Sequence, residues 1–423
     1  MIKFYNKNDV EKLLRRSQLD VEGVNEAVKK IVADVRRDGD KALFDYTEKF
    51  DRIKLTSLTA TVSDEEKAAA YKAVPAETLA ALRRARDNIL AFHKRQMRKD
   101  NVVTTDGKTT GYLIRPVGRA GIYVPGGKAA YPSSVLMCAC PAVVAGVGEI
   151  VMTTPAPDGR LNPLTVVAAA ECGIKRIFKV GGAQAVAALA FGTESIPRVD
   201  VISGPGNIYV AVAKREVFGN VGIDMIAGPS EILIVADDSA NPVYLAADML
   251  SQAEHDELAT SILITDSREI AEKTAVELDK QLSLLPRNEI AGKAISDYGG
   301  VVLTDSLNEA IDIANRVAPE HFELCVRNPE KLLPEIRNAG AVFLGHYSPE
   351  PLGDYYAGPN HVLPTSGTAR FFSALGVDNY VKKISVIRYE KESLMAAADD
   401  IILLAETEGL NAHANSVRVR KGV

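Results

Sequence analysis

The chain has 423 residues, 47% hydrophobic and 25% charged, a composition typical of a globular protein with two or more domains. Its net charge of −5 argues against nucleic-acid binding through a basic surface. The amino-terminal residues soon become charged, and no run reaches about 18 apolar residues, so we expect neither a signal peptide nor a membrane span. Four cysteines without a CxxC motif are typical of the reducing cytoplasm, where we expect this protein.

The first part of the chain is expected to be helical, and an alternating pattern follows it. In residues 1–110, segments 22–37 and 77–98 carry apolar residues at helical spacing. From about 110, short apolar runs alternate with helical patterns, which predicts βαβ units and a parallel sheet covered by helices. The predicted strands are 149–153, 176–180, 199–203 and 231–236, and the predicted helices are 164–172, 183–191 and 208–218.

The alternation resumes after residue 237 and predicts a second α/β domain. Asn241 and Pro242 are typical of a helix start. Ser306 and Glu309 form a predicted capping box for a helix that runs to Val317. The predicted strands are 261–265, 301–304 and 341–344. We therefore expect an α/β protein with a helical region (1–110), two α/β domains with parallel sheets (111–236 and 237–380) and a short carboxyl-terminal appendage (381–423).

Two glycine-rich turns lie between a predicted strand and a predicted helix, at Gly181–Gln184 and Gly204–Asn207. Both would place backbone N–H groups and a helix start at the carboxyl-terminal edge of a parallel sheet, where anionic ligands bind. Neither matches GxGxxG, and a tight turn without a ligand explains each equally well. A third turn, Tyr123–Gly127, presents an aromatic ring and is a weak indication by itself.

Several of the six histidines stand beside acids or amides, which suggests a metal site. Gln252 and His255 are three residues apart near the end of a predicted helix and would share one face. Zinc usually takes four protein ligands, and Asp354 and His413 are the further candidates. Asp354 lies in segment 350–361, which is rich in Gly and Pro and is predicted to be a loop. A structural role for His255 is the open alternative.

Glu320 and His321 follow a predicted helix and a proline, and this pair could provide general-base catalysis. A carboxylate beside an imidazole can divide the activation of an alcohol and of water between the two groups. An ordinary helix end with a surface acid is the alternative. Cys138 and Cys140 have no base partner in the sequence, so we interpret them as buried, unreactive thiols.

These segments together resemble the histidinol dehydrogenase family. The resemblance runs from about residue 30 to about residue 420, in order and without large gaps. The segments that carry it are Tyr123–Gly127, Gly181–Gln184, Gly204–Asn207, Gly228–Glu231, Ser251–Asp256, Ala318–Glu323, Gly353–Thr365 and Glu408–His413. Motifs of this length and number are highly specific.

The resemblance implies a cytoplasmic homodimer that oxidises L-histidinol to L-histidine through the aldehyde, with two NAD+ and one zinc ion per subunit. It implies two incomplete Rossmann-like domains, with NAD bound by 111–236, metal and substrate by 237–380, and a segment exchanged in the dimer at 381–423. The implied zinc ligands are Gln252, His255, Asp354 and His413, which would also contact substrate together with His321. The implied acid–base pair is Glu320 and His321; the other substrate residues are Ser230, His361 and Glu408, and the NAD residues are Tyr123, Gln184 and Asn207. His413 and Glu408 would come from the partner subunit.

Three other functions stay open at this point. A zinc hydrolase could use Glu320 as the base for a metal-bound water. A dimeric binding protein without catalysis is the second alternative. The presence of both acid–base residues and all four candidate ligands argues against it, because such a protein would not need them. A relative that oxidises another small alcohol could share the same fold and metal site.

Overall fold

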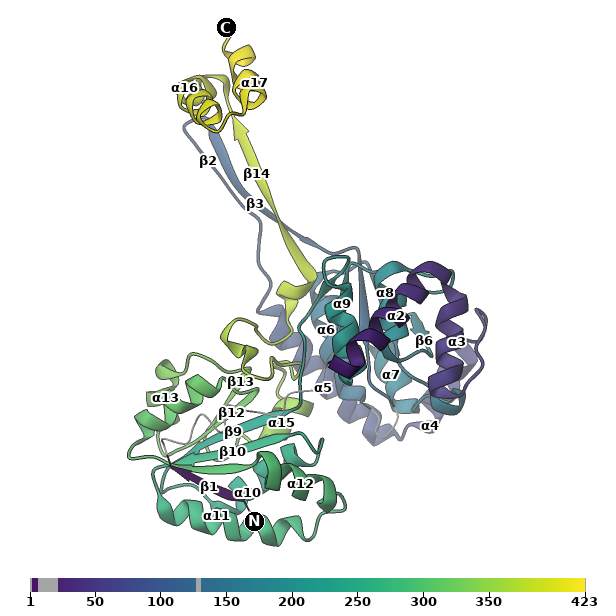
Figure 1. Cartoon of the computed structure of the whole chain (residues 1–423), viewed down its shortest axis with the longest axis vertical. Coiled ribbons are helices and arrows are strands. Elements are labelled where there is room, and N and C mark those ends of the chain that lie inside the picture. The colour runs from purple at the N-terminus through teal and green to yellow at the C-terminus, as the bar shows by residue number, and fades with distance from the viewer. Residues whose placement is uncertain (1, 7–21, 127–130, 423) are drawn as a thin grey trace. The chain divides into compact units, whose positions relative to one another are not determined.

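The computed structural model describes residues 2–6, 22–126 and 131–422 (Figure 1). The chain divides into a larger unit, Met1–Gln96 with Val117–Tyr380, and a smaller unit, Met97–Pro116 with Val381–Val423. The larger unit contains two parallel sheets, which confirms the predicted α/β class. Within the described part of the chain, no helix is both long and apolar enough to cross a membrane.

The first sheet is parallel and lies between two layers of helices. Its strands, in spatial order, are β6 (Arg176–Phe178), β5 (Glu149–Thr153), β4 (Arg119–Tyr123), β7 (Val201–Ser203) and β8 (Gly222–Ile223). Its helices are α2 (Glu22–Asp38), α3 (Asp40–Asp51), α4 (Asp64–Ala73), α5 (Ala76–Lys94), α6 (Pro132–Ala145), α7 (Pro163–Glu171), α8 (Gly182–Phe191) and α9 (Ile208–Val217). A core cluster joins α2, α3, α8 and α9 to one face, and α6 contacts β4 and packs between α5 and α7.

The second sheet is also parallel, and its strand order is β1 (Lys3–Asn6), β11 (Gly300–Leu303), β10 (Thr260–Thr265), β9 (Glu231–Ala236), β12 (His321–Cys325) and β13 (Ala341–Leu344). Ile232 and Ile234 pack against helices α10 (Pro242–Ala253), α11 (Arg268–Leu282) and α12 (Asn288–Tyr298). Leu233 and Val235 face the opposite side, where α13 (Leu307–Val317) packs. Successive residues of a strand point to opposite faces, so this strand is apolar throughout because both faces are covered.

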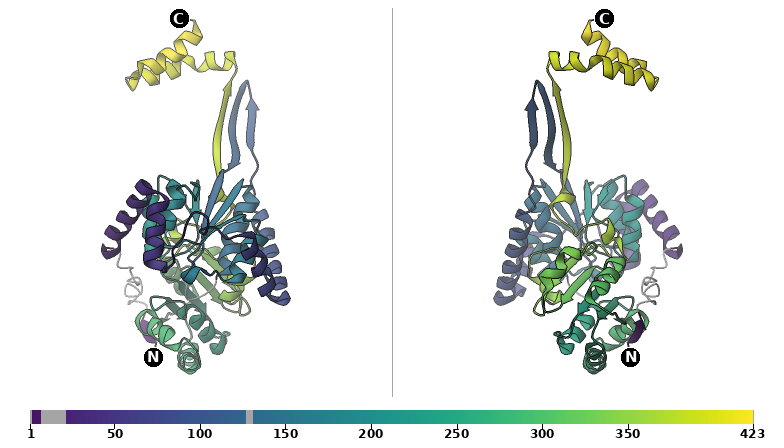
Figure 2. Two further views of the ribbon diagram at one scale, coloured as in Figure 1. Left: turned by 90° about the vertical axis from the view of Figure 1, so that its right-hand side faces the viewer. Right: turned by 90° about the vertical axis from the view of Figure 1, so that its left-hand side faces the viewer.

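The smaller unit is built from two separate parts of the sequence (Figure 2). Strands β2 (Asn101–Thr105), β3 (Lys108–Pro116) and β14 (Val381–Tyr389) form an antiparallel sheet, and helix α16 (Lys391–Thr407) packs against α17 (Asn411–Lys421). Asp106 and Gly107 have positive φ and form the two-residue turn between β2 and β3. Asp-Gly is a preferred sequence for such a turn, so this hairpin could have been predicted and was missed.

The structure corrects three of the expected boundaries. The strand Glu231–Ala236, assigned to the first α/β domain, lies in the second sheet between β10 and β12. The region 1–110 is mostly helical, as expected, but Lys3–Asn6 joins the second sheet and Asn101–Thr105 is a strand of the smaller unit. The appendage therefore consists of residues 97–116 as well as the carboxyl-terminal segment. Such pairings between distant segments leave no mark on local periodicity, because a strand pattern does not specify its partner.

The predicted helix starts are confirmed, with one difference in detail. The side chain of Asn241 accepts from the backbone N–H of Val243 and begins α10. Ser306 accepts from the N–H of Glu309 and begins α13. In a capping box the glutamate accepts from the cap residue itself, whereas the Glu309 carboxylate here accepts from the N–H of Asp305 at 2.8 Å.

Candidate active site

The candidate acid–base pair lies where the strands of the second sheet begin, an edge that we call the catalytic edge. His321 is the first residue of β12 and pairs with Ile232 of the neighbouring strand β9. Glu320 directly precedes β12, and Ser230 directly precedes β9. The segment after α10 enters β10 at the same edge, because Thr260 pairs with Glu231. The topology of the sheet therefore gathers segments that are about 90 residues apart in the sequence.

The backbone of Glu231 holds both members of the pair. Its N–H donates to the Glu320 carboxylate at 2.8 Å, and its carbonyl oxygen is 3.0 Å from Nδ1 of His321. A carbonyl oxygen can only accept, so Nδ1 must carry the proton. In neutral His321, the basic atom is therefore Nε2.

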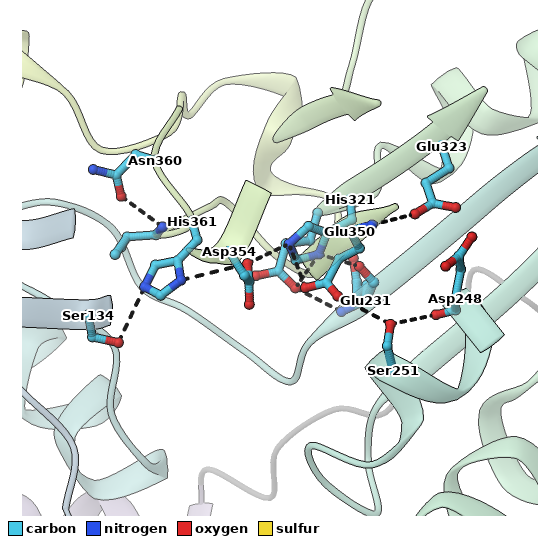
Figure 3. A network of polar contacts seen from close by, with 12 residues as sticks. Ser134, Glu231, Asp248, Ser251, His321, Glu323, Glu350, Asp354, Asn360 and His361 are labelled. Atoms are coloured by element: carbon cyan, nitrogen blue, oxygen red, sulfur yellow. Dashed lines mark hydrogen bonds and ion pairs between the residues drawn. The ribbon is translucent and has the colours of Figure 1, made fainter. Parts of the chain in front are cut away.

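The Nε2 atom of His321 is buried, and none of the described residues offers it a hydrogen bond. It lies 3.8 Å from Oε1 of Glu350 and 3.8 Å from Oδ1 of Asp354 (Figure 3). Burial lowers the pKa of His321. The nearby Glu320, Asp354 and Glu350 raise it by more than burial lowers it, so that the net pKa is about 10. Burial raises the pKa of Glu320 to about 8. A buried polar atom without a hydrogen-bond partner destabilises a protein unless a ligand binds to it.

Glu350 and Asp354, the two carboxylates near this nitrogen, belong to a candidate set of metal-ligating groups. One ligand atom each of His255, Glu350 and Asp354 lies within 4.8 Å of the others. The amide oxygen of Gln252 is buried and has no hydrogen-bond partner among the described residues. His255 follows the end of α10 and is exposed to solvent, whereas Glu350 is buried. Nitrogen and oxygen donors from four side chains suit a divalent metal such as zinc.

Glu350 belongs to this cluster and was missed in the sequence. It is four residues before Asp354 in helix α15 (Glu350–Tyr355), so the two carboxylates share a helix face. The prediction of a loop at 350–361 was wrong for these six residues. Pro351 is compatible with a first helical turn, and a Cβ at position 353 would lie 2.7 Å from the ring of Phe343, so close packing requires Gly353.

Two contacts hold Glu350 in place. Its backbone N–H donates to Oε1 of Glu323 at 2.7 Å, and the hydroxyl of Ser251 is 3.2 Å from its Oε2. The other carboxylate oxygen faces His321 and has no hydrogen-bond partner in the described part of the chain. Burial and the neighbouring Asp354 raise the pKa of Glu350 to about 8.

His361 extends the site toward the helices of the first sheet. Its Nδ1 is 3.6 Å from Oδ1 of Asp354, and its Nε2 is 3.3 Å from the hydroxyl of Ser134 in α6. The preceding residue, Asn360, is buried and donates to the carbonyl oxygen of Met137 at 2.6 Å. The structure therefore brings His361 beside Asp354.

The candidate NAD residues lie where the strands of the first sheet end, an edge that we call the dinucleotide edge. Tyr123 ends β4, and its hydroxyl accepts from the N–H of Gly182, the first residue of α8, at 3.1 Å. Gln184 is buried, and its amide oxygen has no hydrogen-bond partner among the residues described. The side-chain oxygen of Asn207 caps α9 through the N–H of Val210. The amide nitrogen of Asn207 is thus the atom left to donate to a ligand.

Glu408 and His413 lie in the smaller unit. Glu408 follows α16, and His413 is in the first turn of α17. Both side chains are exposed. Of the twelve site residues expected from the sequence, only these two lie outside the larger unit.

The cysteines show the features of unreactive thiols. Cys138, Cys140 and Cys325 are buried. Burial raises the pKa of the Cys138 and Cys325 thiols well above the ordinary value. A thiol in this state is a poor nucleophile near neutral pH, which agrees with our interpretation of the sequence.

Comparison with known proteins shows the family of the chain. The family described as histidinol dehydrogenase matches residues 14–421. A histidinol dehydrogenase of Caldanaerobacter subterraneus subsp. tengcongensis is 55% identical over 409 residues, covering 97% of this chain and 95% of the relative. That of Geobacter sulfurreducens is 54% identical, covering 96% of each chain. The crystal structure of histidinol dehydrogenase from Elizabethkingia anophelis superimposes with a TM-score of 0.95 at 40% identity, covering 100% of this chain and 98% of the other. The chain belongs to the histidinol dehydrogenase family of oxidoreductases.

Proposed function

We propose that this protein oxidises L-histidinol to L-histidine in histidine biosynthesis, in two NAD-linked steps through the aldehyde. The observation that carries the proposal is the state of His321. Its Nδ1 is held as a donor by the Glu231 carbonyl, and its Nε2 faces the candidate metal ligands without a hydrogen-bond partner in the described part of the chain. An imidazole in a fixed orientation, with its basic nitrogen available, can remove the proton of an alcohol.

One zinc ion per subunit fits the donors of the catalytic edge. Gln252, His255 and Asp354 would hold it, and an oxygen of Glu350 is a fourth candidate donor within this chain. When bound, the metal would supply a template for the amine and imidazole nitrogens of histidinol, and NAD+ would accept the hydride. The positive charge would also offset the carboxylates that raise the pKa of His321, which favours its neutral form at Nε2.

The two residues of the acid–base pair have different tasks in this proposal. His321 accepts the hydroxyl proton through Nε2 in each oxidation. Glu320 activates the water that adds to the aldehyde, because its high pKa makes it a competent base near neutral pH. Ser230 and His361 position the substrate. Ser230 directly precedes β9 at the catalytic edge, and His361 lies beside Asp354.

We also propose that two copies of the chain form a dimer in the cytoplasm, with His413 and Glu408 of each copy completing the site of the other. The smaller unit exposes large apolar side chains, with Ile387 77%, Leu403 63% and Leu404 65% exposed. Such a surface is typical of a subunit interface. Mixing inactive His321→Asn and His413→Asn proteins should restore up to about a quarter of wild-type activity after subunit exchange. Baseline activity despite exchange would contradict shared sites.

The direct test of the activity is absorbance near the reduced-nicotinamide band after NAD+ and histidinol are added to metal-analysed protein. We expect reduction of NAD+ that depends on histidinol. A zinc hydrolase, the alternative with Glu320 as base, would give no such absorbance. Other small alcohols in the same assay would show how far the activity extends beyond histidinol.

A further inference from the structure

A buried ion pair lies beneath the glycine turn of the dinucleotide edge. Lys214, in α9, and Asp224, after β8, are 2% and 3% exposed, and their charged groups are in direct contact. Removal of two charges from water offsets most of their attraction, so such a pair is a poor source of net stability. Its contacts with the backbone suggest another role.

Both members of the pair bind the same residue of the turn. The N–H of Gly204 donates to Oδ2 of Asp224 at 2.8 Å, and Nζ of Lys214 donates to the carbonyl oxygen of Gly204 at 3.0 Å. The other oxygen of Asp224 accepts from the N–H of Met225 at 2.6 Å. The carboxylate therefore fixes one side of Gly204, the ammonium group fixes the other, and their mutual attraction fixes the distance between them.

Gly204 has little freedom on its remaining side. Its φ is +115°, a conformation that favours glycine, and a Cβ there would lie 2.1 Å from the carbonyl oxygen of Tyr123. Asn207, three residues later, caps α9, and the same helix carries Lys214. The pair thus connects three elements: the end of β7, the carboxyl-terminal half of α9 and the segment that follows β8.

We propose that Lys214 and Asp224 are positioning residues for the dinucleotide, which hold the turn so that Asn207 and the N-terminus of α9 face NAD. This inference rests on the proposed NAD-linked function. The ammonium group of Lys214 is buried and is used by Gly204 and Asp224, so its effect on the dinucleotide is through the turn and not through direct contact. Binding energy should then depend on the pair, while the chemistry at the catalytic edge should not.

The test uses full-length, metal-loaded protein with Asp224→Asn and with the double change Lys214→Met/Asp224→Asn. Asparagine has the shape of aspartate and keeps one oxygen for the Gly204 N–H, but Asp224→Asn leaves the buried charge of Lys214 without its partner, so it is the more demanding variant for folding. The double variant leaves no uncompensated charge. The matched control is Glu149→Gln, which removes an ion-paired carboxylate from the opposite edge of the same sheet, where Glu149 pairs with Arg119 and Arg176. NAD+ affinity is measured by calorimetry, with thermal midpoint, kcat and the KM for histidinol alongside.

We expect the Kd for NAD+ to rise about tenfold in both pair variants, as for the loss of one well-made hydrogen bond. At saturating NAD+, kcat and the KM for histidinol should stay within about twofold of wild type. The control should lower the thermal midpoint without changing the Kd. An unchanged Kd in either folded pair variant, or an equal rise in the control, would overturn the inference. Failure of the wild-type protein to bind NAD+ would instead contradict the proposed function.

Discussion

The two parallel sheets of the larger unit carry candidate sites at opposite ends of their strands. The dinucleotide edge lies where strands end and α8 and α9 begin, so it offers backbone N–H groups and the positive ends of helix dipoles. The catalytic edge lies where strands begin and where α10 and α13 end, so it offers the negative ends of helix dipoles and buried carboxylates. The first environment suits the anionic pyrophosphate of a dinucleotide, and the second suits a cation.

The two edges also differ in how they are built. Glycines and main-chain contacts shape the dinucleotide edge, where Gly204 packs against the backbone of Tyr123. Charged side chains shape the catalytic edge, where the buried carboxylates of Glu320 and Glu350 and the half-buried carboxylate of Asp354 lie around His321. We therefore expect changes at the first edge to affect NAD binding and changes at the second to affect chemistry and metal content.

The largest effect is expected for His321→Asn, which removes the base from both oxidations. Turnover should fall by about 10²–10⁴-fold, the usual contribution of a general base, while NAD+ affinity stays within about twofold. The matched control is His346→Asn. His346 contacts Ser239, and these two residues follow the ends of β13 and β9, at the edge of the sheet opposite the catalytic edge. Comparable losses in both variants would mean that His321 acts through stability and not as the base.

Metal content should respond next, because carboxylates of Glu350 and Asp354 lie close to His255 at the catalytic edge. A chelator should abolish activity, and added zinc should restore it. His255→Asn should reduce the metal found per subunit sharply, since it removes one donor of the cluster. Glu350→Gln should weaken metal retention less, because the amide keeps one oxygen. Full occupancy in purified His255→Asn protein would exclude this residue from the metal site.

Glu320→Gln should separate the two oxidations. Conversion of the aldehyde to histidine requires water activation and should slow by about 10²-fold or more, whereas the alcohol step should be less affected. Rapid-mixing assays that begin from histidinol or from the aldehyde measure each step. Equal losses from both starting points would show that Glu320 is not the base for water.

The smallest effect is expected at the dinucleotide edge. Asn207→Ala removes the cap of α9 and the side chain expected to contact NAD, so the KM for NAD+ should rise about tenfold with little change in kcat. The thermal midpoint should fall only slightly, because loss of a helix cap costs about 1 kcal/mol. A fall in kcat with an unchanged KM for NAD+ would place Asn207 outside the dinucleotide site.

Much of the fold could be predicted because its patterns are local. The apolar run Glu231–Ala236 predicts a strand, but a run buried on both faces carries no information about its sheet, so we assigned it to the wrong one. The smaller unit was partly missed because β3 pairs with β14, about 270 residues later. Glu350 was missed because its role depends on a short helix whose Gly and Pro favour a loop. The motifs therefore predicted a set of candidate site residues, and only the three-dimensional structure added the carboxylate of Glu350 to it.

The most direct test of a single site that performs both oxidations is the amount of NAD+ reduced per molecule of histidinol consumed by the wild-type protein. Two NAD+ per histidinol, with histidine as the product and no free aldehyde, is the predicted result. One NAD+ per histidinol with accumulation of the aldehyde, or no reduction of NAD+, would contradict the proposed function.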